Sequence, residues 1–117
     1  MESVDRMELT DRLLDELIAE SKADEVGLWF IIAALREEYG VKDTVQRRLL
    51  TLSLVQKLLD SGQVVAGYYS PDGSGAIIPW NKSTAEVLSR IISEWDSLGR
   101  DPSIGEVVVF VSPPTDG

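Results

Sequence analysis

Residues 43–80 read DTVQRRLLTLSLVQKLLDSGQVVAGYYSPDGSGAIIPW, and this stretch decides the fold of the chain. Asp43 followed three residues later by Gln46 is the pattern of a capped helix N-terminus, and Gly62 suits the left-handed residue that ends a helix. Between these signals, apolar residues recur at steps of three and four. They predict one long helix whose buried face is formed by Val45, Leu49, Leu52, Val55 and Leu59, widened by Leu50, Leu54 and Leu58.

Two strands are expected directly after this helix. Residues 63–69 are rich in β-branched and aromatic side chains, residues 70–75 have the chemistry of a turn, and residues 76–80 read as the returning strand. Pro79 cannot donate a hydrogen bond to a neighbouring strand, so the second strand should lie at a sheet edge or end there.

The rest of the chain supplies three more helices and one more strand. A capping box, Ser83 with Glu86, predicts the start of one helix, and Gly99 predicts its end. Asp24 is the expected cap of a helix through the apolar residues 28–35, for which a buried strand is the alternative. The elements predicted outside residues 43–80 are helices over residues 7–21, 24–39 and 83–98 and a strand over residues 106–111.

This order, α-α-α-β-β-α-β, predicts one α+β domain over residues 1–117 with a small antiparallel sheet, and with flexible ends at residues 1–6 and 112–117. A chain of 117 residues that is 44% hydrophobic has enough apolar material for one core. Its apolar runs are shorter than the roughly 18 residues that span a bilayer. The absence of cysteine and the acidic N-terminus, which lacks the pattern of a signal peptide, lead us to expect a cytoplasmic protein.

Charge is the most informative global property of the sequence. The formal net charge is −9, and residues 1–25 carry nine carboxylates against three cations. Such a surface repels nucleic acid and anionic membranes and attracts basic proteins, although an acidic surface can also serve solubility alone.

The side chains that most enzymes use are missing. There is no histidine and no cysteine, which removes the common general base, the thiol nucleophile and the soft metal ligands. Gly73 and Gly75 lie between two strands rather than before a helix, so they do not form a phosphate-binding loop, and Ser74 reads as a turn serine. We therefore expect a protein that is not an enzyme and has no metal or cofactor, with an uncharacterised carboxylate enzyme as an alternative.

The element order over residues 24–111 resembles the winged-helix superfamily. In that family the third helix enters the major groove of DNA, and basic residues grip phosphates. The resemblance assigns such a role to Arg47 and Arg48, in a transcription regulator that binds DNA as a dimer. Against this alternative, the third helix is nearly neutral and the predicted turn carries Asp72 and no cation.

The charge, the size and the missing catalytic residues are similar to those of small acidic bacterial immunity proteins, which cap toxins. We therefore predict a protein-binding domain whose partner is a basic protein such as a nuclease toxin. A homodimer through residues 7–21 is left open. One of the two adjacent tyrosines should point away from the core, because strand side chains alternate between faces. The predicted contact residues are Glu8, Asp11 and Asp15, or else Asp72 with Tyr68 and Tyr69.

Overall fold

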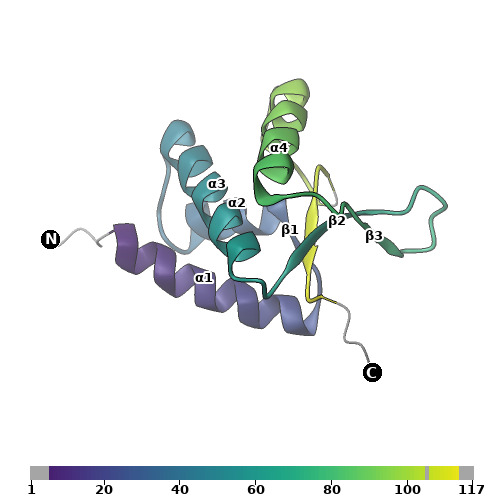
Figure 1. The fold of residues 1–117 in the computed structure, drawn as a ribbon. Helices are drawn as coiled ribbons and strands as arrows, with labels where there is room; N and C mark the ends of the chain where they lie inside the picture. Colours follow the sequence, from purple (N-terminus) through teal and green to yellow (C-terminus); the bar gives the residue numbers. More distant parts are fainter. Residues whose placement is uncertain (1–5, 105, 114–117) are drawn as a thin grey trace, which may run out of the picture.

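The computed structural model describes residues 6–104 and 106–113, and these residues form four helices and four strands (Figure 1). The α+β class and the small antiparallel sheet are confirmed. The sequence predicts flexible ends at residues 1–6 and 112–117, and most of these residues lie outside the described ranges. The elements are α1 (Arg6–Ala23), β1 (Val26–Gly27), α2 (Leu28–Glu37), α3 (Thr44–Asp60), β2 (Val65–Tyr69), β3 (Ile77–Pro79), α4 (Thr84–Leu98) and β4 (Val109–Val111).

The four strands form one antiparallel sheet in the order β1-β4-β2-β3. The last strand of the chain therefore lies between strands that precede it, with Phe110 opposite both Val26 and Ala66. β3 lies at one edge of the sheet and ends at Pro79, which confirms the expectation for this proline. The hairpin of β2 and β3 extends away from the helices (Figure 1).

β1 is an additional strand that local sequence pattern did not predict. Its two residues pair with Phe110 and Val109, far away in sequence, and Gly27 then becomes the N-terminal cap of α2. The prediction that Asp24 caps this helix is therefore wrong. The Asp24 carboxylate instead accepts a hydrogen bond from the backbone N–H of Glu25 at 2.9 Å. Residues 28–35 are helical, as predicted, and not a buried strand.

α3 is the central helix and packs against α1, α2 and α4. Asp43 is its cap, as predicted, and accepts the N–H of Gln46 at 2.9 Å. The reciprocal bond of a capping box is not formed, because Gln46 Oε1 is buried without a partner among the described residues. Gly62 has a φ of 73° just beyond the helix, which confirms the predicted stop.

The buried face of α3 differs from the predicted one. Val55, Leu54 and Leu58 are buried as expected, but Val45 and Leu49 are 65% and 59% exposed. Two polar residues, Arg47 and Thr51, take the inward positions nearer the helix start. The helix is apolar on two sides, and packing against three neighbouring helices decided which side turned inward.

α4 matches its sequence prediction closely. Ser83 and Glu86 form the predicted capping box, and Gly99 ends the helix in the left-handed conformation with a φ of 68°. β4 is shorter than the predicted strand, because residues 106–108 turn before the pairing begins. There the Glu106 carboxylate holds Arg100 and the N–H of Ser103.

Candidate functional site

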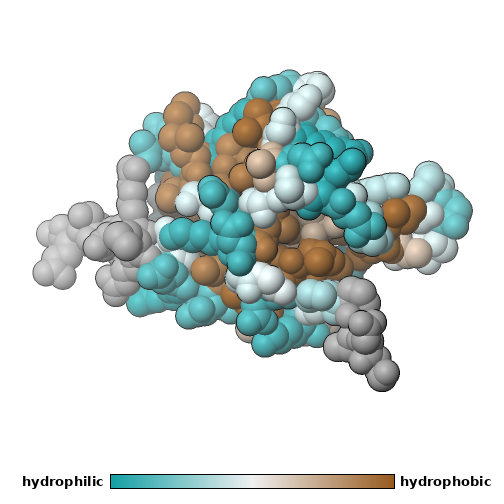
Figure 2. Space-filling view, in the orientation of Figure 1, coloured by the Kyte–Doolittle hydropathy of each residue, from teal (hydrophilic) through white to brown (hydrophobic). Residues whose placement is uncertain are grey.

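The described part of α1 and the two residues after it present an acidic surface. We define this surface by six exposed carboxylates, and it contains only Arg12 and Lys22 as cations. The i, i+4 spacing places Asp11 in line with Asp15, and Glu16 in line with Glu20, about 100° further round the helix. The carboxylates therefore cover most of the exposed half of α1 rather than a single edge, and this part of the protein is hydrophilic in Figure 2. The six residues of the acidic surface are Asp11, Asp15, Glu16, Glu20, Asp24 and Glu25.

The apolar side of α1 is covered within the same chain. Leu13 and Leu17 are at most 1% exposed and belong to the main core, and α1 contacts α3, β1 and β4. Within the described side chains of residues 10–21, Leu13 and Leu17 are therefore not available to the homodimer that was left open. Among the predicted contact residues of α1, Asp11 and Asp15 are exposed, whereas the Glu8 side chain lies outside the described residues.

A tyrosine hydroxyl joins the hairpin to the acidic surface. The Tyr69 hydroxyl donates to Glu25 Oε1 at 2.7 Å, across 44 positions of sequence. This bond, together with partial burial, raises the pKa of Tyr69 to about 12. The pKa of Glu25 is lowered in turn, by hydrogen bonding to Asp24 and then to Tyr69. Tyr69, one of the predicted contact residues of the hairpin, is therefore bonded to the acidic surface at Glu25, which was not among the predicted contact residues.

The other hairpin residues have separate roles. Tyr68 is 37% exposed and lies opposite Ile78 across the two strands, while Tyr69 is half-buried, so one tyrosine does point away from the protein body. The Asp72 carboxylate accepts the N–H of Ser74 at 2.9 Å and shapes the turn. Hydrogen bonds, first of all with Ser74, lower the pKa of Asp72 and keep the turn anionic.

The arginines of residues 26–113 are all paired within the protein, whereas the three lysines of this range, Lys42, Lys57 and Lys82, make no ion pair with a described residue. The five arginines each pair with a carboxylate, at distances from 2.7 to 3.2 Å. None of these five carboxylates belongs to the acidic surface, which makes no ion pair with another described residue. The arginine partners are Arg36–Glu37, Arg47–Asp101, Arg48–Asp96, Arg90–Glu94 and Arg100–Glu106.

The two arginines of the DNA-binding hypothesis are both engaged inside the protein. Arg47 is buried and donates to the carbonyls of Val41 and Lys42 as well as to Asp101. Arg48 pairs with Asp96 at 2.7 Å, and its guanidinium lies 5.1 Å from the centre of the Trp95 ring. In this conformation Arg47 presents no donor to a phosphate backbone, and Arg48 would have to give up two contacts.

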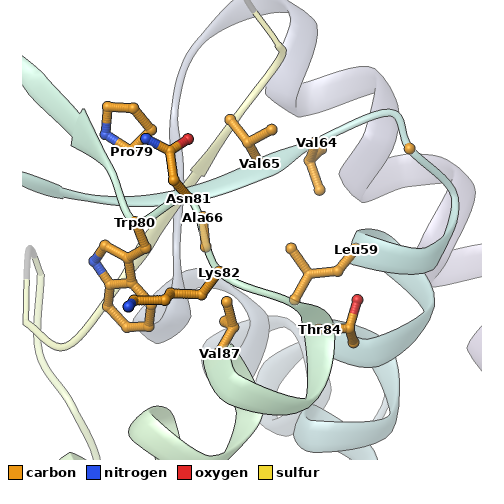
Figure 3. Close-up of a pocket in the computed structure, with 11 residues that line it drawn as sticks. Leu59, Val64, Val65, Ala66, Pro79, Trp80, Asn81, Lys82, Thr84 and Val87 are labelled. Carbon is orange, nitrogen blue, oxygen red and sulfur yellow. The ribbon is translucent and has the colours of Figure 1, made fainter.

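A cavity of about 320 Å³ lies where the α3–β2 turn, the end of β3 and the first turn of α4 meet (Figure 3). Leu59, Val64 and Val87 supply apolar walls, and Trp80 is buried beside them under the Arg90 guanidinium, 4.4 Å from its ring centre. Lys82 is the one titratable side chain among the residues that line it. The cavity therefore offers no acid–base pair for catalysis, and its lining does not select a reactive ligand over an apolar one.

Comparisons with protein-family models, with curated proteins and with solved structures found no match for this chain. The described residues hold no group of three or more potential metal-ligating side chains. Within the same ranges, no helix is both long and apolar enough to cross a membrane. The site must therefore be argued from its own geometry.

Sequence reasoning missed part of the acidic surface. Glu16 and Glu20 share the i, i+4 spacing of Asp11 and Asp15, so that signal was present in the sequence. The Glu25–Tyr69 bond had no local signal, because the two residues meet only after the sheet has formed. A second tyrosine contact, from the Tyr39 hydroxyl to Glu16 Oε1 at 3.0 Å, likewise joins the loop after α2 to this surface.

Proposed function

We propose that this chain is a non-enzymatic protein-binding domain whose acidic surface binds a basic protein partner, in the manner of an inhibitor that caps a nuclease toxin. The observation that carries the proposal is the separation of charge. The arginines of residues 26–113 are used in internal ion pairs, whereas the six carboxylates of the acidic surface make none with the described residues.

This separation matters physically because an ion pair within the protein weakens the field that a partner would meet. An unpaired row of carboxylates keeps its field in solution, so it raises the rate at which a cationic protein arrives and orients that protein as it approaches. The hydroxyls of Tyr39 and Tyr69 hold two of the six carboxylates, Glu16 and Glu25, in place without cancelling their charge. A basic active-site cleft covered by such a surface would be closed to nucleic acid.

The test is capture of the partner from the source cells by the immobilised protein at low and moderate salt. The wild type should retain a basic protein, with less recovered as salt rises, because screening weakens exposed charge pairs. The Asp11→Asn/Asp15→Asn double variant should bind that partner roughly 2- to 30-fold more weakly, since two exposed pairs contribute about 0.2–1 kcal/mol each. Folding should not suffer, because the change removes a like-charge pair at i, i+4.

The matched control is the Glu37→Gln/Glu94→Gln double variant, which changes the net charge equally at two ion-paired positions away from the acidic surface. It should bind the partner within about twofold of the wild type if position, and not overall charge, decides. Equal losses in both double variants would reduce the proposal to a non-specific charge effect. A retained partner that is acidic, or whose binding ignores salt, would overturn it.

A further inference from the structure

The outward face of α3 carries an apolar stripe that no described residue covers. Val45 and Leu49 are 65% and 59% exposed, and among the exposed large hydrophobic side chains of the described residues only Ile104, at 73%, exceeds them. Leu52 continues the same line at the i, i+4, i+7 spacing and is partly buried. Figure 2 shows hydrophobic atoms over the N-terminal part of this helix.

A hollow of about 300 Å³ adjoins this stripe, between the first turn of α3 and the last turn of α4. Val45 and Arg48 line one side of it and Trp95 lines the other. The Trp95 ring is 4% exposed and is held under the Arg48 guanidinium, whose other contact is Asp96. Leu49, one turn after Val45, is therefore an exposed apolar projection beside a defined recess.

The charges around this hollow balance, although the formal charge of the chain is −9. The charged residues that line it are two arginines, Arg48 and Arg100, and two aspartates, Asp96 and Asp101. Two copies of a chain with a formal charge of −9 repel each other over most orientations. At the α3–α4 hollow that repulsion is reduced, because each copy presents a locally neutral surface.

We propose that the outward face of α3 is the interface between two copies of this chain. A two-fold axis brings the same surface of both copies together, so the projection and the recess must both lie on it. The α3 face meets that requirement: Leu49 of each copy would enter the hollow beside Val45 and Trp95 of the other. A foreign partner would have no need for both features on one surface, which is why the second copy is the occupant that we favour.

The test is the molar mass in solution, by sedimentation equilibrium of the full chain from 10 µM to 500 µM at 0.15 M and 1 M NaCl, concentrations on the order of those at which weak dimers form. The chain has a mass of 12.9 kDa, so the dimer has twice that mass. Leu49→Lys should weaken dimerisation at least tenfold, because it places a charge in an apolar contact. The matched control is Ile78→Lys, which makes the same change at an exposed apolar residue of the hairpin and should leave the dimer intact.

The variants are expected to fold, since both side chains are exposed, and far-UV circular dichroism with the urea midpoint checks this. Higher salt should preserve or strengthen the dimer, because it screens the mutual repulsion of the two copies. A wild type that stays monomeric up to 500 µM at both salt concentrations would overturn the proposal. Equal weakening of the dimer by Leu49→Lys and Ile78→Lys would also overturn it. If the wild type is monomeric and Leu49→Lys loses partner capture, the α3 face binds another protein and the proposal is wrong.

Discussion

Replacing Arg47 tests whether its guanidinium belongs to the protein interior or is available to a phosphate backbone. Its side chain is 7% exposed. One terminal nitrogen donates to the carbonyls of Val41 and Lys42 at 3.1 and 3.2 Å, and the other donates to Asp101 Oδ2 at 3.2 Å. Arg47→Ala would remove a buried aliphatic stem and leave two carbonyls and a carboxylate without their donor.

The expected magnitude follows from these contacts. Removing one partner of a fully buried ion pair costs about 3–5 kcal/mol. The Asp101 side chain is 39% exposed, so water can solvate it after the substitution and reduce the loss. We therefore expect Arg47→Ala to lower the free energy of unfolding by about 2–3 kcal/mol. Arg47→Met keeps the apolar stem and should lose roughly half as much.

Urea denaturation followed by tryptophan fluorescence measures this change, since Trp80 and Trp95 are buried in the fold. With a slope of about 1.5 kcal/mol per molar urea, the midpoint of Arg47→Ala should fall by about 1.5 M. The control Arg48→Ala removes a side chain that is 33% exposed and should cost about 1 kcal/mol or less. If Arg47→Ala instead unfolds at the wild-type midpoint, the internal role of Arg47 is wrong and a phosphate-binding role becomes tenable.

Three further predictions concern a cap and two perturbed pKa values. Ser83→Ala removes the cap of α4 and should lower the free energy of unfolding by about 1 kcal/mol in the same urea assay. Ultraviolet titration should give Tyr69 a pKa of about 12, and Glu25→Gln should return that pKa toward 10.0. The stability that this hydrogen bond contributes is complete below pH 10 and is lost as pH rises through 12. Carbon-detected NMR should give Glu106 a pKa of about 2, because its carboxylate is bonded to Arg100, and Arg100→Gln should raise that pKa toward 4.5. The stability that this ion pair contributes is present above pH 4.5 and is lost as pH falls through 2.

Each of these predictions has a result that contradicts it. Ser89 is an exposed serine inside α4, so Ser89→Ala should not destabilise the protein, and a loss equal to that of Ser83→Ala would rule out capping as the cause. A Tyr69 titration that does not respond to Glu25→Gln would remove the link between the hairpin and the acidic surface. Glu106 titrating near 4.5 in the wild type would show that its carboxylate is not paired in solution.

The parts of the fold that the sequence predicted well depend on local chemistry. The capping box at Ser83, the cap at Asp43 and the helix ends at Gly62 and Gly99 each need only a few neighbouring residues to form. The hairpin was predicted for the same reason, since turn residues and strand composition are adjacent in sequence. None of these signals depends on what packs against the element.

The parts that the sequence did not predict depend on distant residues. β1 consists of two residues that are a strand only because they pair with residues 109 and 110. The inward face of α3 is set by α1, α2 and α4 together, and the leucines on both sides of that helix made either face consistent with helical periodicity. The charge of the acidic surface was visible in the sequence, but its lack of ion pairs became apparent only once the arginine partners were known.

The two proposed contacts should respond to salt in opposite directions. Binding of a cationic partner to the acidic surface is a long-range attraction between exposed charges, so raising the salt from about 0.15 M to 1 M should weaken it as the Debye length falls from roughly 8 to 3 Å. Contact between two α3 faces is apolar and locally neutral, and the same salt removes only the repulsion between two acidic chains. Salt alone does not assign the contacts to different surfaces, because at one acidic surface screening would also weaken attraction to a cationic partner and relieve repulsion between two copies. Weaker dimerisation with unchanged capture in Leu49→Lys, and the reverse in the Asp11→Asn/Asp15→Asn variant, would require two separate surfaces on the chain.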